Sequence, residues 1–146
     1  MTKPPVFPYE TTLEVRDTCL CLHLQRAARA VARRFDEAFR PFGLTNGQFS
    51  LLMSLNRPEP PVMGDVAKLL ALDRTTLTAN LKPLERRGLV EVAPDPFDRR
   101  SRRLKLTRDG ADLLAKAWPV WRDTHAELDE LVGDTDRLRR DLLLLS

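Results

Sequence analysis

Two short stretches of alternating residues constrain the fold of this chain most strongly. LVEVA (89–93) and RLKLT (103–107) alternate between apolar and polar residues, a pattern typical of β-strands with one buried face. The loop between them contains two prolines, so the two stretches are predicted to pair as an antiparallel hairpin. Elsewhere apolar residues recur at helical steps of three and four. The expected fold is therefore mainly α with a small β-hairpin, in the α+β class.

Helical periodicity and capping residues predict six helices around this hairpin. They are expected over residues 12–40, 45–55, 63–70, 74–87, 108–131 and 134–145. Thr45 and Gln48 form a predicted capping box, while Asp73 and Thr107 are predicted N-caps of the helices that follow them. Three prolines among the first ten residues predict an extended arm over 1–10.

The composition narrows the class of protein. With 146 residues, of which 42% are hydrophobic and 31% charged, the chain fits one globular domain over 1–146. A membrane span needs about 20 consecutive apolar residues, and the apolar runs here are only a few residues long. No signal-peptide pattern is evident, so a cytoplasmic protein without a membrane partner is expected. Two cysteines are too few for a disulfide framework or a four-thiolate zinc site, and no metal or other cofactor is expected.

Positive charge is concentrated in one region of a chain whose net charge is only +3. Residues 73–108 hold ten Lys or Arg against five Asp or Glu, and the loop of the predicted hairpin is the densest part. A local basic region of this kind is typical of a surface that binds a polyanion. The alternative is a solvated charged face without a partner.

The order of elements specifies what that region can do. A helix over 63–70, a link of three residues, a helix over 74–87 and a hairpin together form a winged helix-turn-helix, here spanning 44–107. Its second helix enters a major groove, where short hydroxyl and amide side chains let the backbone approach the bases. The hairpin, or wing, then delivers arginines to phosphates or to a minor groove. The candidate DNA-binding residues are Arg74, Thr75, Thr76, Thr78, Asn80, Lys82, Asp98, Arg99, Arg100, Arg102 and Arg103.

Four parts of the chain resemble the MarR family of bacterial transcriptional regulators. GLTNGQFSLLMSL (43–55) is similar to the family's second helix, and DRTTLTANLKPLERRGLV (73–90) to its recognition helix. DPFDRRSRRLKLTRDG (95–110) is similar to its wing signature, with Phe97 where the family often has a basic or polar residue. Ala79 also stands where many relatives carry a larger polar residue. The first helix and the last two match the family's dimerisation helices in layout.

The resemblance implies a sequence-specific regulator, not an enzyme, that binds double-stranded DNA. It implies a homodimer on a palindromic operator, with repression as the commoner mode. The dimerisation helices would span 10–42 and 108–146, with LLLL (142–145) in the dimer core. Asp98 and Arg100 match the wing-tip pair, in which Arg100 would enter the minor groove while Asp98 holds its side chain.

The resemblance also implies a ligand cleft walled by the helix over 108–131. Trp118 and Trp121, with Phe49 and Met53, could stack on a small aromatic or phenolic effector whose binding releases the DNA. Arg26 could pair with a carboxylate on that effector. The alternative is that these side chains are ordinary core.

Cys19 raises the alternative of a redox-sensing regulator. Cys19 and Cys21 are two residues apart, so on a continuous helix they point to roughly opposite sides and cannot form an internal disulfide. His23 lies one helical turn after Cys19. The simpler hypothesis is that both cysteines pack as small buried apolar residues.

Two further classes of function remain open. A thiol-dependent enzyme that uses Cys19 and His23 would leave the basic wing unexplained and lacks a third orienting group. A winged-helix module that binds proteins instead of DNA would need an acidic partner surface opposite Arg99–Lys105.

Overall fold

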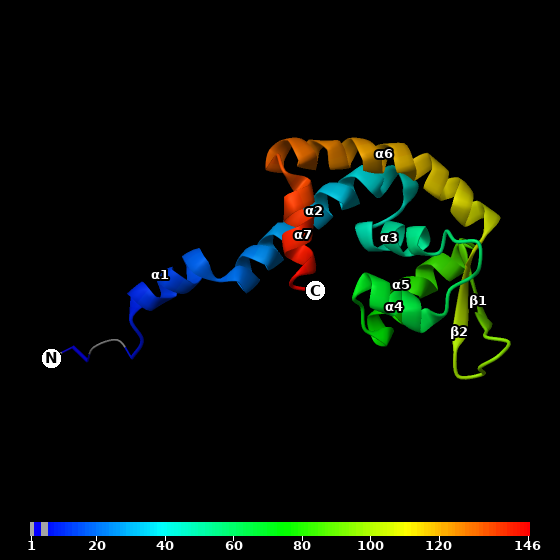
Figure 1. Ribbon diagram of the computed structural model, residues 1–146, viewed down its shortest axis with the longest axis horizontal. Coiled ribbons are helices and arrows are strands. Elements are labelled where there is room, and N and C mark those ends of the chain that lie inside the picture. The colour runs from blue at the N-terminus through cyan, green and yellow to red at the C-terminus, as the bar shows by residue number, and fades with distance from the viewer. Residues whose placement is uncertain (1, 4–5) are drawn as a thin grey trace. The chain divides into compact units, whose positions relative to one another are not determined.

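The computed structural model describes residues 2–3 and 6–146 (Figure 1). The chain divides into two compact units, 1–34 and 35–146. The first unit holds α1 (Tyr9–Thr18) and most of α2 (Leu20–Phe39). The second holds the end of α2, a 3-10 turn (Arg40–Phe42), α3 (Asn46–Ser54), α4 (Met63–Leu70), α5 (Arg74–Arg86), β1 (Val90–Pro94), β2 (Arg102–Leu106), α6 (Arg108–Val132) and α7 (Thr135–Leu143). The mainly helical fold with one hairpin is as the sequence predicts.

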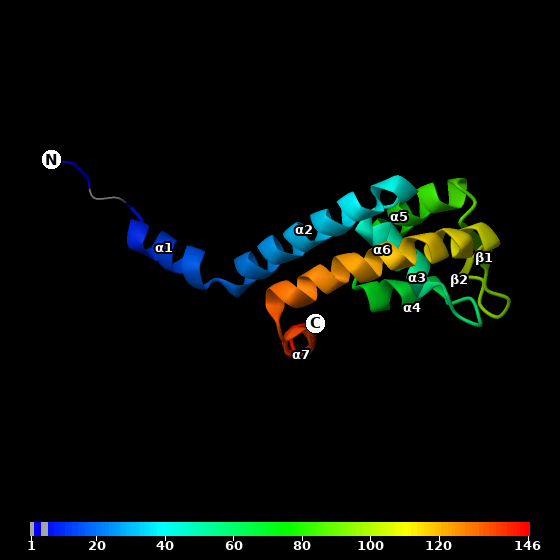
Figure 2. The same cartoon turned by 90° about the horizontal axis from the view of Figure 1, so that it is seen from above.

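The core of the second unit forms around α3. Figures 1 and 2 show α6 running over α3, while α4 and α5 lie on its other side. Leu51 and Leu52 are fully buried, and the ring of Phe49 stacks on that of Phe39 with centroids 4.5 Å apart. Full burial of such a side chain contributes roughly 1.5–3 kcal/mol each. This core is the rigid base that carries α5 and the hairpin.

The predicted N-terminal caps of α3, α5 and α6 are confirmed. Thr45 accepts a hydrogen bond from the Gln48 backbone N–H, and Gln48 reaches back to the Thr45 N–H, which completes the capping box. Thr107 accepts from Gly110 N at 3.0 Å and so caps α6. Asp73 caps α5. These local bonds satisfy amide groups that the helices themselves leave without partners.

The first predicted helix is wrong in one respect. The sequence predicts one helix over 12–40, but the chain leaves helical geometry at Cys19, whose ψ is 111°. Asp17, Thr18 and Cys19 are all weak helix formers. The Thr18 hydroxyl donates to the Glu14 carbonyl, and the Cys19 sulfur accepts from the Leu22 N–H. These side-chain bonds offer the backbone an alternative to continued helix, so α1 ends and α2 begins here.

The N-terminal arm is shorter than expected. The sequence predicts extended chain over 1–10, whereas α1 already begins at Tyr9, with the extended Pro8 as its N-cap. Proline suits a position just before or at the first turn of a helix, because its missing N–H is not needed there. Pro4 and Pro5 lie outside the described residues.

The hairpin pairs in an antiparallel register, with Val90 opposite Leu106 and Val92 opposite Leu104. Its strands are shifted by one residue from the predicted bounds. A third segment joins it, because Val62 bridges to Arg103 and Leu104 N donates to Pro61 O at 2.9 Å. This link ties the loop before α4 to the wing.

None of the described helices is long and apolar enough to cross a membrane.

Candidate nucleic-acid interface

The turn between α4 and α5 sets the start of the second helix. Ala71 adopts a left-handed conformation, with φ 53°, and ends α4. Two residues later, Asp73 accepts from Thr76 N at 2.7 Å and from the Thr76 hydroxyl at 3.0 Å. The backbone N–H of Thr76 is the main cause that lowers the pKa of Asp73 below its ordinary value. The carboxylate therefore holds the first turn of α5 in place.

One face of α5 is buried and the opposite face is open. Leu77, Leu81 and Leu84 are buried, as the sequence predicts. The exposed residues of the candidate set on this helix are Arg74, Thr75, Thr76, Thr78 and Lys82. Asn80 is only half-exposed, because it lies beside the buried row. Ala79 is exposed in the middle of the open face, where a small side chain lets another molecule approach the helix backbone closely.

Arg86 belongs to the same open face but was not singled out from the sequence. At 3.6 residues per turn, Thr75, Ala79, Lys82 and Arg86 follow one another along one side of α5. All four are exposed. The signal that could have found Arg86 is its spacing of four residues from Lys82.

The tip of the wing is a closed turn. Asp95 N donates to Ser101 O, and Ser101 N donates to Asp98 O, both at 3.0 Å. The Asp98 carboxylate accepts from the backbone N–H of Arg100 at 3.0 Å. Asp98 therefore orients Arg100 through its backbone, whereas the resemblance implied a contact with the side chain. Arg99 and Arg100 occupy the two central positions of this turn and are exposed.

Arg103, a predicted DNA-binding residue, makes structural contacts within the chain. Its Nε donates to Asp95 Oδ1 at 2.8 Å, and its Nη1 donates to Pro60 O at 2.7 Å. Asp95 is only 8% exposed. The guanidinium thus joins the base of the wing tip to the loop before α4, while Arg102 remains exposed.

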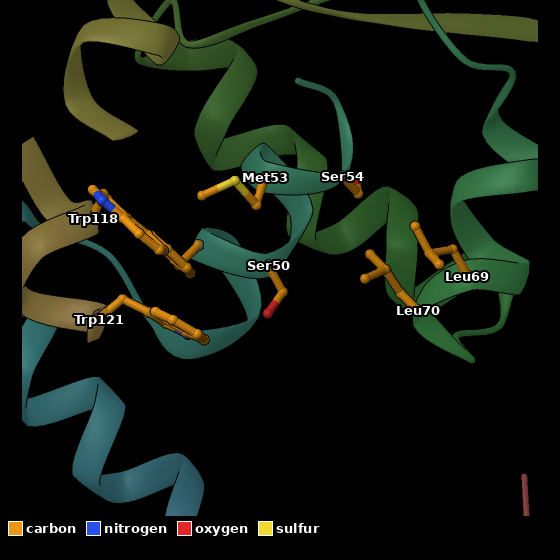
Figure 3. A pocket seen from close by; sticks show the side chains of 8 residues that line it. Ser50, Met53, Ser54, Leu69, Leu70, Trp118 and Trp121 are labelled. Carbon is orange, nitrogen blue, oxygen red and sulfur yellow. The ribbon is translucent and has the colours of Figure 1, made fainter. Parts of the chain in front are cut away.

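A second feature of this unit is a cavity of about 470 Å³ between α3, the end of α4 and α6 (Figure 3). It is lined by Phe49, Ser50, Met53, Ser54, Leu69, Leu70, Trp118 and Trp121. Four of the predicted ligand-binding residues therefore line one cavity, namely Phe49, Met53, Trp118 and Trp121. The rings of Trp118 and Trp121 stack at 5.3 Å, and His125 stacks on Trp121 at 4.8 Å.

The lining of this cavity is mainly apolar. Its eight lining residues carry no charge, and the hydroxyl of Ser54 already donates to Leu51 O. Leu69 and Leu70, at the end of α4, were not predicted as lining residues. Their part depends on how α4 packs on α3, which no local sequence pattern reports. Arg26 is exposed on α2, in the first unit.

The two cysteines do not pack as buried apolar residues. Cys21 is exposed and Cys19 is half-exposed. The Cys19 sulfur lies 3.4 Å from Leu22 N, in the N-cap position of α2. The ring of His23 bonds to the backbone carbonyl of Cys19 at 2.7 Å instead of to its thiol.

Comparisons with known proteins agree with this arrangement. A family model described as "MarR family" matches residues 42–101. The transcriptional activatory protein BadR of Rhodopseudomonas palustris is 35% identical, over 79% of this chain and 66% of that protein. The transcriptional repressor NicR of Pseudomonas putida is also 35% identical, over 79% of this chain and 70% of that protein. The crystal structure of the Mycobacterium tuberculosis regulator MosR in complex with DNA is 42% identical, with a TM-score of 0.81, and covers 88% of this chain and 93% of that one.

Proposed function

This chain belongs to the MarR family of DNA-binding transcriptional regulators, and we propose that it represses transcription as a homodimer on a palindromic operator. The observation that carries the proposal is the pairing, within one unit, of an open helix face with a rigid basic wing tip. Thr75, Thr78 and Lys82 present hydroxyl and ammonium groups on α5. Arg99 and Arg100 present two guanidinium groups on the wing. DNA-binding regulators of this family are not enzymes, so the thiol-enzyme hypothesis gains no support.

The shape and charge of α5 and of the wing suit them to different parts of the DNA. An α-helix fits the major groove, where the threonines of α5 would meet base edges and phosphates. A guanidinium fits a narrow minor groove, whose potential is strongly negative. Arg100 would enter it, because the Asp98 carboxylate holds its backbone in a closed turn. Arg99 and Arg102 would contact the flanking phosphates, and Arg103 would support the wing from within.

The exposed leucines of α7 and the residues after it support a dimer. Leu138, Leu142, Leu143, Leu144 and Leu145 are all at least partly exposed, and Leu144 reaches 85%. A contiguous apolar patch on a soluble chain marks an interaction surface. A second copy of this chain is the partner that the paired half-sites of a palindrome require.

The cavity supports release by a small aromatic effector. Because its eight lining residues are uncharged, the space suits the aromatic ring of a ligand, held against Trp118 and Trp121. Any carboxylate on that ligand would need a cation from outside these eight residues. Filling the cavity would shift α4 against α6 and so change the position of α5.

The test is a gel-shift titration with DNA from upstream of the chain's own gene, against random DNA of equal length. The proposal expects tighter binding to the promoter DNA. The affinity should fall steeply as salt rises, because the Lys and Arg side chains displace counterions from the DNA phosphates when the protein binds. Arg100→Ala should weaken binding and flatten the salt dependence. Equal binding to both DNAs, together with no effect of Arg100→Ala, would show that the proposed function is wrong. A reporter assay with and without the chain then separates repression from activation.

The effector is tested in the same assay with a panel of phenolic carboxylates and uncharged aromatics. Trp118 and Trp121 are the chain's two tryptophans, so ligand entry should quench intrinsic fluorescence. Trp118→Leu should abolish the release of DNA while DNA binding itself is kept. Release that is unchanged in Trp118→Leu would remove the cavity from the mechanism.

A second candidate function, redox control through Cys19, is favoured by the break between α1 and α2. The Cys19 sulfur caps α2 and is half-exposed, so it is accessible to a peroxide. The sulfur would attack a peroxide oxygen and the O–O bond would break, so that the thiol and a hydroperoxide become a sulfenic acid and an alcohol or water, which would alter the cap. Cys19→Ser keeps an oxygen acceptor at the cap but cannot follow this reaction. If peroxide releases DNA equally from the wild type and Cys19→Ser, Cys19 is not the sensor.

A further inference from the structure

The least explained residue of the wing is Phe97, whose side chain is 93% exposed at the tip. We propose that its ring packs against deoxyribose sugars that wall the minor groove, beside the site that Arg100 enters. The inference rests on the proposed DNA-binding function. It assigns the wing an apolar contact with DNA in addition to its charged ones.

The backbone around Phe97 is held by hydrogen bonds. The bond between Asp95 N and Ser101 O closes the loop, and the bond between Ser101 N and Asp98 O closes the turn inside it. Pro96 fixes one backbone angle directly before Phe97. Asp95, one residue earlier, is buried and bonded to Arg103. The ring is therefore held out on a supported frame, and little backbone entropy is lost when it meets a partner.

The surroundings of Phe97 indicate which partner that is. The exposed cations of the tip are Arg99, Arg100 and Arg102, and they would face a polyanion. On DNA, the phosphates and base edges are polar, whereas the walls of the minor groove expose the C–H groups of the sugars. An aromatic ring that enters with these arginines can bury apolar area against those walls. An acidic protein surface would match the cations, but it need not carry an apolar area next to its acidic groups.

The position of Phe97 in the turn favours contact with sugars over insertion between bases. Apolar side chains that unstack a base step act as wedges at the most advanced point of a protein surface. In this wing that point belongs to Arg99 and Arg100, the central residues of the turn closed by Asp98 and Ser101. Phe97 precedes the turn and lies on its flank. The ring consequently reaches the groove wall, and the DNA is not kinked by it.

The experiment compares wild type, Phe97→Ala and Arg99→Ala on promoter DNA from the chain's own gene at several salt concentrations. Phe97→Ala removes the apolar area that the ring would bury against the sugars, so this variant should bind the DNA about tenfold more weakly. The slope of affinity against salt should be unchanged, because no charge is lost. Arg99→Ala is the matched control, since losing a phosphate contact should lower that slope by about 1 for each protomer. The melting temperature of Phe97→Ala should equal that of the wild type, because the ring is exposed.

Each other outcome overturns the inference. Wild-type affinity for Phe97→Ala would mean that the ring makes no contact with DNA. A loss of affinity with a lower salt slope would assign the effect to displaced arginines. A kinked operator that straightens in Phe97→Ala, measured by circular-permutation gel shift, would show insertion between bases instead. Wild-type protein that binds promoter DNA no better than random DNA would refute the proposed function itself, a result distinct from these three.

Discussion

Arg103 and Asp95 lie 2.8 Å apart, Nε to Oδ1, and their contact joins the strand that returns from the wing tip to the start of the tip loop. Asp95 is almost fully buried, and Arg103 is about one-third exposed. The same guanidinium reaches Pro60 O, so a single side chain connects three segments. The geometry of the wing tip depends on this pair.

The first prediction follows from that contact. Arg103→Ala leaves the Asp95 carboxylate buried without its partner, which should lower the free energy of unfolding by about 1–2 kcal/mol. Arg100→Ala removes an exposed side chain and should leave stability unchanged. Urea unfolding of the two variants measures the difference. Equal stability of the two would show that the Arg103 contact does not support the wing.

The second prediction concerns the pH dependence of stability through Asp73. Its folded pKa lies below the ordinary value of 3.8, mainly because the Thr76 N–H donates to the carboxylate. A depressed folded pKa contributes stability that is full above the unfolded pKa and is lost as pH falls through the folded pKa. The wild type should therefore lose stability relative to Asp73→Asn between about pH 5 and about pH 3. If the free energy of unfolding changes with pH by the same amount in both proteins across that range, the prediction is wrong.

The third prediction concerns the close approach of α6 to the hairpin at Gly110. A methyl group there would overlap the carbonyl oxygen of Leu89 and lie 2.7 Å from Leu106 Cδ1. Gly110→Ala should destabilise the protein by about 1–3 kcal/mol, because backbone atoms cannot move aside easily. Gly47→Ala is the matched control, since its nearest neighbour would be 4.0 Å away and alanine favours helix. Thermal melting should show a lower midpoint for the first variant alone.

The fourth prediction tests the proposed dimer. Leu143 and Leu144 are exposed at the end of α7, so replacing both with Glu should not disturb the core of the unit. Burying four carboxylates in a two-fold interface would be strongly unfavourable. Sedimentation should show a dimer for the wild type and a monomer for the double variant, with weaker operator binding. A double variant that sediments as the wild type does would place the interface elsewhere.

The sequence by itself determined the elements whose signals are local. The capping box of Thr45 and Gln48, the N-caps Asp73 and Thr107, and the buried row of Leu77, Leu81 and Leu84 all depend on residues within one or two turns. Alternation likewise predicted the hairpin, to within one residue at each strand. Such patterns could be read without the fold because each residue's partner is a near neighbour in the chain.

Tertiary structure decided which side chains remain available for function. Arg103 and Arg100 look alike in the sequence. The guanidinium of Arg103 is nevertheless bonded to the carbonyl of Pro60, a residue 43 positions away that the fold brings beside it. Leu69 and Leu70 line the cavity through the packing of α4 on α3. The residue types are set by local pattern, but hydrogen-bond partners and cavity walls are set by contacts between distant segments, and only the folded chain brings those together.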